Sequence, residues 1–417
     1  MRHKGVISCL GAAVLLAVTG CSGFKTNPVT WEDIASTIPS NPTFIASLNV
    51  SIPADTAFND VWGNQDMSRV LSMGLALDTV LPSHVVVAGV DGVTYVTWPL
   101  QNPRLVWQNI DNWETASLNN TVDAHICVVG SASIVISSTQ AWVVNNQHAA
   151  DNVNDLLSAA MNTKAAHTQP FAQCITTTPA MGTLVVPYEG RYYVADLNHE
   201  DGLLRVDVNA YSKSNNRVNI VDGLGRLPYE FIDKISPVSP FAAIEIERGT
   251  MPEAIVRIAK LFDKRSIKLA SQLVAPVFEN ADGTVTTLWD DRRIRVKVPF
   301  TSREAAATAA ANLKNILHTT GYDIEVRTHK DTLDITHAID AHLPFIDADR
   351  RTPSVYSQTE NPSAVAFARL DLSRKDPVEA YFELAPTHAR LQVDFKDNPE
   401  NLAQVIEFVK NIVFRIL

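Results

Sequence analysis

The sequence predicts an α+β protein built from repeated units of antiparallel sheet with helices packed on one face. Three observations predict it: Asp-Gly turns between short β-rich segments, helix starts with capping-box residues, and recurrence of these elements along the chain. The recurring order is strand, helix, hairpin, helix, strand, which matches the ferredoxin-like β-α-β-β-α-β order. Such a unit leaves one sheet face free for a second unit or a partner.

Composition supports several domains with sizeable cores. The 417 residues are 46% hydrophobic and 19% charged, and a domain usually takes roughly 100–200 residues. We divide the chain into a cleaved signal peptide (1–20), a lipidated Cys with a tether (21–40), and an N-terminal α+β domain (41–180). A C-terminal α+β domain (181–417) then contains two repeat units, at about 238–330 and 361–417.

The first twenty residues have the pattern of an export signal. Arg2 and Lys4 give a positive start, and residues 6–18 form an apolar run shorter than a bilayer span. Val18-Thr19-Gly20-Cys21 resembles the bacterial lipobox, in which the Cys thiol receives a diacylglycerol group and becomes the first residue after cleavage. We therefore expect a lipid anchor on Cys21, since each buried CH₂ contributes ~0.8 kcal/mol. The alternative is a chance Cys after a plain secretory signal.

Charge and the residues after Cys21 bear on location. No acidic residue occurs between Cys21 and Glu32, and by resemblance to lipoproteins of diderm bacteria this favours the outer membrane, facing the periplasm rather than displayed on the surface. The formal net charge is −10, so no basic surplus exists for a nucleic-acid partner. The negative charge also favours solubility beside an anionic membrane over docking onto it.

Strands are predicted in order by their turns. The turn residues Asp and Gly tolerate positive φ, which tight hairpins require. Asp91-Gly92 joins 84–90 to 93–98, Asp201-Gly202 joins 191–197 to 203–211, Asp222-Gly223 ends 217–221, Asp282-Gly283 precedes 284–289, and the turn 290–292 leads to 294–300.

Helices are predicted by capping boxes and apolar spacing. Residues 301–304 and 397–400 both fit the capping-box pattern. The first opens an Ala-rich helix through about His318. The second opens a helix that continues to the C-terminus, with one apolar face: Leu402, Val405, Ile406, Val409, Ile412 and Val413. Residues 150–162 and 251–274 also have helical spacing.

The elements repeat. Residues 296–316 align with 391–412, and 95–110 is a weaker third copy. A Pro-led apolar strand lies upstream of each copy, beginning at Pro42, Pro240 and Pro362. The sequence therefore predicts three related units.

Two cysteines remain beside Cys21 in the exported chain. Cys127 and Cys174 lie in apolar segments, and in an oxidising periplasm they could form one disulfide. The alternative is two separately buried thiols, because Cys is commonly buried. No CxxC or Cys/His cluster with zinc spacing occurs, so no metal site is predicted.

Candidate chemistry is sparse. Trp98, Trp107 and Trp113 fall close together and could form an aromatic platform for sugars or a peptide, although core packing is the favoured interpretation. The stretch 329–342 is rich in His and Asp, but its spacing favours a polar hairpin over a metal site. No GxSxG, Walker, GxGxxG or HExxH motif occurs. We therefore assign no catalytic residue and no cofactor, and favour a protein that is not an enzyme.

Three features together resemble a known family: the lipobox, the strand NPTFIASLNV, and the ending LQVDFKDNPENLAQVIEFVKNI. They are similar to a family of Bacteroidota envelope lipoproteins known as a domain of unknown function. The resemblance implies a lipid on Cys21 and brings no catalytic residues. We predict a lipid-anchored, non-enzymatic scaffold that binds an envelope protein. The alternative is a glycan- or lipid-handling lipoprotein, such as a hydrolase, with an aromatic site in the N-terminal domain.

Overall fold

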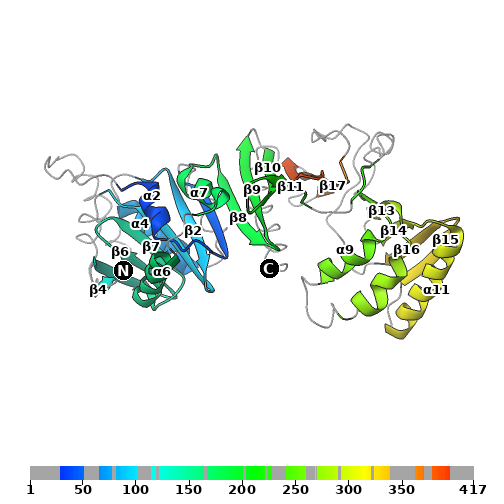
Figure 1. Cartoon of the computed structure of the whole chain (residues 1–417), viewed down its shortest axis with the longest axis horizontal. Helices are drawn as coiled ribbons and strands as arrows, with labels where there is room; N and C mark the ends of the chain where they lie inside the picture. Colours follow the sequence, from blue (N-terminus) through cyan, green and yellow to red (C-terminus); the bar gives the residue numbers. More distant parts are fainter. Residues whose placement is uncertain are drawn as a thin grey trace, which may run out of the picture. The chain divides into compact units, whose positions relative to one another are not determined.

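The structure is a computed structural model of the whole chain. It describes residues 29–50, 65–77, 81–101, 114–118, 122–163, 167–200, 203–220, 224–227, 241–259, 268, 270–289, 293–320, 324–338, 362–370 and 378–394. The chain divides into two compact units. Unit 1 comprises Met1–Leu197 with Tyr211–Asn216, and unit 2 comprises Asn198–Ala210 with Arg217–Leu417. Every strand pair for which a register is given is antiparallel, so the predicted class of antiparallel sheet with helices is confirmed (Figure 1).

The sheet of unit 1 is built mostly from neighbours in sequence. Its strand order is β4-β5-β6-β7-β3-β2-β1-β8-β9. The strands are β1 (Phe44–Asn49), β2 (His84–Val90), β3 (Val93–Pro99), β4 (Glu114–Leu118), β5 (Val122–Val129), β6 (Ala132–Ile136), β7 (Gln140–Val144), β8 (Gly182–Tyr188) and β9 (Arg191–Glu200). The expected domain boundary near residue 180 differs from the observed division, because β8 pairs with β1 inside unit 1.

The hairpin of β2 and β3 forms as its turn predicts. Asp91 and Gly92 have φ values of 49° and 79°. Both lie in the left-handed region that a two-residue hairpin turn requires, and Asp and Gly reach it at low cost. Local turn chemistry therefore accounts for this pair of strands.

Helices cover both faces of the unit 1 sheet, which corrects the expectation of one covered face. Val85 and Val87 of β2 lie in a core cluster with residues of α4 (Gln65–Leu77). Val86 and Ala88, which point to the opposite face, pack with α7 (Gln169–Thr176). The same face receives α6 (Ala149–Thr163), and α2 (Trp31–Ser36) packs against α7. Every residue of β2 is buried, because the strand lies between two helical layers.

The sheet of unit 2 has the order β15-β16-β14-β13-β12-β17-β18-β19-β10. The strands are β10 (Leu203–Ser212), β12 (Phe241–Ile246), β13 (Gly283–Trp289), β14 (Arg293–Pro299), β15 (Ile324–His329), β16 (Thr332–Ala338), β17 (Ala364–Leu370), β18 (Val378–Leu384) and β19 (His388–Asp394). The short β11 (Arg217–Val218) also belongs to this unit.

Helices of unit 2 pack on one side of β13, β14 and β16. Val298 and Leu333 contribute to a core cluster with Ala306 and Leu313 of α11 (Arg303–Thr320). α9 (Thr250–Ala259), the π-helix η1 (Ala270–Val274) and the 3₁₀ helix η2 (Ala275–Phe278) complete this layer. The Ser302 hydroxyl accepts a hydrogen bond from the Ala305 N–H at 3.1 Å. The helix predicted from residue 301 onward is therefore confirmed, with Ser302 at its N-terminus.

The two units share a strand order, although the predicted ferredoxin-like repeat is not seen. β6-β7-β3-β2-β1-β8-β9 in unit 1 corresponds to β15-β16-β14-β13-β12-β17-β18 in unit 2, and α4 and α9 occupy equivalent places. A split β-α-β arrangement needs parallel neighbours, whereas β12, β13 and β14 form an antiparallel series. The strand after Pro362 is β17, the counterpart of β8. The described elements therefore form two copies of one order rather than three.

Candidate functional site

Trp98, the first residue of the predicted aromatic platform, lies in the core. The Trp98 side chain is fully buried, in the cluster that α4 forms with β2, β3 and β6. It packs so closely on α4 that a Cβ at Gly74 would lie 3.1 Å from its ring. Trp107 and Trp113 lie outside the described residues. Core packing, the favoured interpretation of Trp98, is confirmed.

The two predicted partner cysteines are separate free thiols. Cys174 is buried between α7 and the sheet, whereas Cys127 packs at the edge of the α4 cluster on the opposite face. The Cys174 thiol lies 3.7 Å from the Ile45 carbonyl and 3.6 Å from that of Thr183. Burial raises the pKa of Cys174 to about 12, with Asp196 adding to the shift. Cys21 lies outside the described residues.

A buried histidine that no sequence motif indicated connects β2 to the end of α7. His84 Nε2 lies 2.9 Å from the Ile175 carbonyl, and Nδ1 lies 3.0 Å from the Ser83 hydroxyl and 3.2 Å from that of Thr178. Since Nε2–H must donate to the carbonyl, Nδ1 accepts. The ring stacks on Trp31 at a centroid distance of 3.7 Å.

The electrostatics of His84 fit a neutral structural link. Its side chain is fully buried, and burial lowers its pKa below 6.5, with the hydrogen bond to Ile175 opposing the shift. A neutral ring keeps one donor and one acceptor, and both are used here. We assign His84 to the stability of unit 1 rather than to catalysis.

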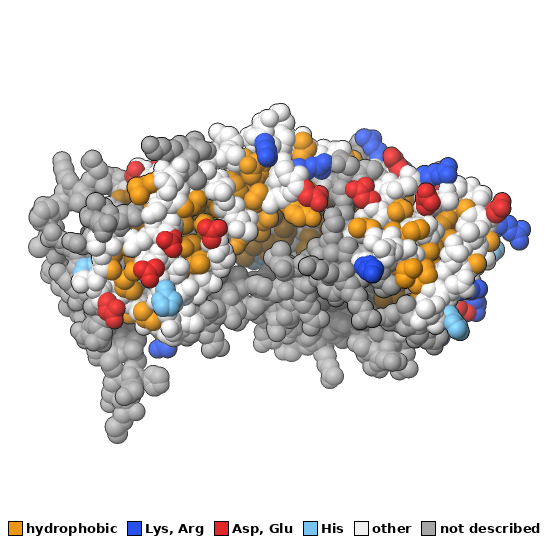
Figure 2. All heavy atoms as spheres, turned by 60° about the horizontal axis from the view of Figure 1, so that its bottom comes forward, with side chains coloured by type: hydrophobic (Ala, Val, Ile, Leu, Met, Phe, Trp, Pro, Cys, Tyr) orange, Lys and Arg blue, Asp and Glu red, His pale blue; other side chains and the backbone are white. Residues whose placement is uncertain are grey.

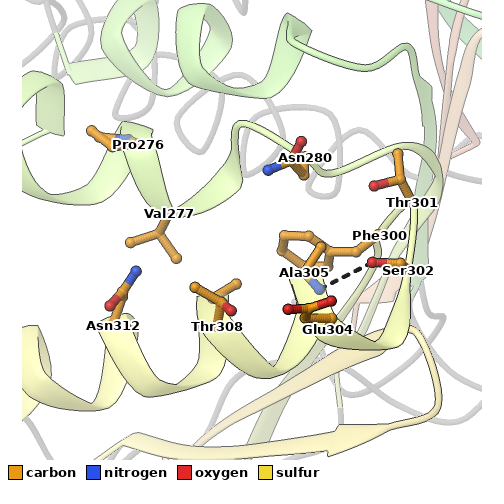
Figure 3. A pocket seen from close by; sticks show the side chains of 11 residues that line it. Pro276, Val277, Asn280, Phe300, Thr301, Ser302, Glu304, Ala305, Thr308 and Asn312 are labelled. Atoms are coloured by element: carbon orange, nitrogen blue, oxygen red, sulfur yellow. Dashed lines mark hydrogen bonds between the residues drawn. The ribbon is translucent and has the colours of Figure 1, made fainter.

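A polar groove lies beside the first turns of α11 in unit 2 (Figure 3). Its volume is about 330 Å³, which is at the lower end of small-molecule sites. Val277, Phe300 and Ala309 supply apolar surface, and the remaining lining is largely hydroxyl and amide: Asn280, Thr301, Ser302, Thr308 and Asn312. Glu304 adds the one carboxylate among its lining residues. This chemistry can hold a small polar molecule, but it offers no pair of groups for proton transfer.

An apolar strip follows four strands of unit 2. The register places the side chains of alternate residues of β17, β18, β19 and β10 on one face of the sheet. This apolar sheet face consists of Ala364, Ala366, Ala368, Val378, Ala380, Phe382, Leu384, Ala389, Leu391, Val393, Leu204, Val206, Val208 and Ala210. Phe382, Leu391 and Val206 lie opposite one another near its centre, and all three are partly exposed.

The strands β13–β16 are covered by α11 and its neighbouring helices on one side. The side that faces away from α11 is charged, and no helix of the described core packs on it. Arg293, Arg295 and Lys297 are exposed and alternate along β14 with Ile294, Val296 and Val298, which face α11. We call this side the open face of unit 2. In the view of Figure 2, Lys and Arg side chains stand at the edge of the body that carries α11 and β15.

Comparisons with known proteins give little. No protein-family model matches the sequence, and no curated protein matches it. Among solved structures, the chain is similar to crystal form III of TP0453, a Treponema lipoprotein, with 10% identity over 73% of this chain and 93% of that one. The TM-score is 0.24, and a likeness at this level supports no inference about function.

Two further findings concern the described residues alone. Among them, no helix is both long enough and apolar enough to cross a membrane. No group of three or more His, Cys, Asp or Glu side chains within the described ranges is arranged to hold a metal ion.

Proposed function

We propose that this chain is a lipid-anchored bacterial envelope protein that acts as a non-enzymatic binding scaffold at the outer membrane, facing the periplasm. The signal segment and the lipobox ending at Cys21 support the anchor. The resemblance to the Bacteroidota envelope family supports the same location. The single observation that favours binding is the apolar sheet face of unit 2.

The apolar sheet face suits a partner with an apolar stripe. Its opposing triplets, such as Leu384, Ala389 and Val208, carry no hydrogen-bonding side chain. Removing such surface from water contributes roughly 25 cal/mol per Å². Six members of this face, among them Val378 and Val393, are buried, and Phe382, Leu391 and Val206 near its centre are partly exposed. A partner's apolar group would bind at this partly exposed centre.

A lipid-handling role is the second candidate, and the same face favours it because acyl chains are as apolar as the side chains that form it. The glycan-handling alternative lacks comparable support, since Trp98 is buried and cannot stack on a sugar. The hydrolase version has no pair of catalytic groups in the groove beside α11.

Photo-crosslinking tests the binding surface in intact cells. A photoreactive residue replaces Phe382, and in a matched control it replaces Asn215 in the exposed turn after β10. The scaffold proposal expects a crosslinked envelope protein from position 382 and none from 215. Crosslinks to lipid alone would favour lipid handling. A crosslink only to residues 397–417 of the same chain would show that the face is closed by the protein itself and overturn its binding role.

The anchor is tested by a separate experiment. The Cys21→Ala variant should lose incorporation of labelled fatty acid and leave the membrane fraction. A Cys127→Ala control should keep both. Membrane retention of the cleaved Cys21→Ala protein would contradict the anchor. Protection of a C-terminal tag from protease until cells are permeabilised would support the periplasm-facing position.

A further inference from the structure

We propose that the open face of unit 2 docks onto an anionic lipid bilayer and so orients the anchored protein. This inference rests on the proposed function, because a lipid on Cys21 would hold unit 2 near a membrane. It goes beyond that function by naming the surface that meets the lipid and the headgroup chemistry that it selects.

The first step is the placement of the charges. Arg293, Arg295 and Lys297 occupy alternate positions of β14, so their side chains leave the same face of the sheet. Successive members of this row are ~6.6 Å apart along the strand. Arg327 joins them from β15 on the same face, because its cross-strand partner Asp334 is also the partner of Lys297.

The second step is the balance of charge on this face. The side chains of Arg293, Arg295 and Lys297 are exposed and form no hydrogen bond or ion pair with any part of the chain that the structure describes. Arg327 forms an ion pair with Glu325, whose side chain is 52% exposed, and exposed pairs of this kind contribute little. Glu325 and Asp334 offset two of the four basic groups, and Glu245 of the adjacent β12, whose carboxylate accepts a hydrogen bond from Thr284 on this face, offsets a third. A net positive face therefore remains in a chain whose overall charge is −10.

The third step is the match to a bilayer. The basic side chains stand in a row on a sheet rather than around a cavity, so they suit an extended anionic surface. Leu288 of β13 lies directly opposite Arg295 on this face and is 40% exposed. An apolar side chain beside basic ones can enter the boundary between headgroups and acyl chains. Each Lys or Arg near an anionic surface contributes about 1 kcal/mol.

The negative charge of the whole chain favours one orientation of the protein on an anionic membrane. An acidic protein is repelled by an anionic membrane in most orientations. The orientation that presents the open face brings its row of basic side chains within a Debye length, about 8–10 Å, of the membrane surface. The lipid on Cys21 would supply attachment, and the open face would supply orientation.

Flotation with lipid vesicles tests the inference. The mature chain with Cys21→Ala is mixed with phosphatidylcholine vesicles that contain or lack phosphatidylglycerol. Without its lipid, the protein should float with the anionic vesicles at low salt and not with the neutral ones. Neutralising two charges, in Arg295→Gln with Lys297→Gln, should weaken binding about 30-fold. High salt should also weaken binding to the anionic vesicles, because it screens the charges.

A matched control separates the open face from total charge. Arg303→Gln with Lys314→Gln removes two exposed basic side chains from α11, on the helix side of the same unit. This variant should bind like the unsubstituted protein. Circular dichroism of both variants checks folding. Equal flotation with neutral and anionic vesicles, or equal weakening by both pairs, would overturn the inference. If the unsubstituted chain is lipidated in cells but the Cys21→Ala protein does not float with anionic vesicles, the inference is overturned and the proposed anchor still stands.

Discussion

Removing Arg390 should destabilise unit 2 strongly. Arg390 of β19 donates from Nε to Asp207 of β10 at 2.5 Å, and its Nη1 lies 3.7 Å from Glu383 of β18. The Glu383 side chain is fully buried, whereas those of Arg390 and Asp207 are 19% and 24% exposed. Arg390→Met keeps much of the side-chain volume but leaves a buried carboxylate without this cation. Breaking a buried pair in this way costs about 3–5 kcal/mol.

Hydrogen exchange during urea unfolding gives the assay, because peptides from β18 and β19 report on unit 2 alone. The Arg390→Met protein should lose about 3–5 kcal/mol of protection in these peptides. Glu383→Gln in the same chain should restore part of the loss, because it removes the buried negative charge that Arg390 no longer balances. A loss below about 1 kcal/mol for Arg390→Met, the range of surface pairs, would refute the reasoning. So would a double variant no better than the single one.

Three further predictions concern unit 1. Trp98→Ala should lower the free energy of unfolding by about 3–5 kcal/mol, measured by calorimetry, because it empties a fully buried site. A change below about 1 kcal/mol would contradict core packing and favour a binding role for Trp98. His84 has a lowered pKa, so its contribution to the free energy of unfolding is complete above about pH 6.5. That contribution is lost as pH falls below this value, since the unfolded chain then binds the extra proton. His84→Gln should flatten this part of the profile of stability against pH, measured by urea unfolding, and an unchanged slope would contradict the prediction. Cys127 should react with iodoacetamide before Cys174, whose pKa is raised to about 12; finding neither thiol in the denatured, unreduced protein would indicate the disulfide instead.

Local sequence signals predicted the elements that depend on local physics. Asp91-Gly92 predicted a hairpin because two positive φ values are all that its turn requires. The residues around Ser302 predicted the start of α11 because the cap satisfies N–H groups within one turn. The strand at 294–300 was predicted from the turn before it. These features need no knowledge of a distant partner.

The pairing of distant strands could not be read in the same way. β3 pairs with β7 across three intervening strands, β4, β5 and β6, and β12 pairs with β17 far along the chain. Period-two alternation shows that a segment is a strand but not which edge it meets. The ferredoxin-like order is not seen for this reason, since it depended on the pairing of segments that only look alike.

The same distinction between local signals and tertiary structure applies to the candidate sites. By itself the sequence determined the overall negative charge, the export signal with Cys21 as the predicted lipid site, and the absence of familiar catalytic motifs. Only the tertiary structure decided that Trp98 is core, that Cys127 and Cys174 lie on opposite sheet faces, and that Arg293, Arg295 and Lys297 share an uncovered face. The physical reason is that burial and surface charge belong to faces. Which face is covered depends on helices and strands brought together from distant parts of the chain.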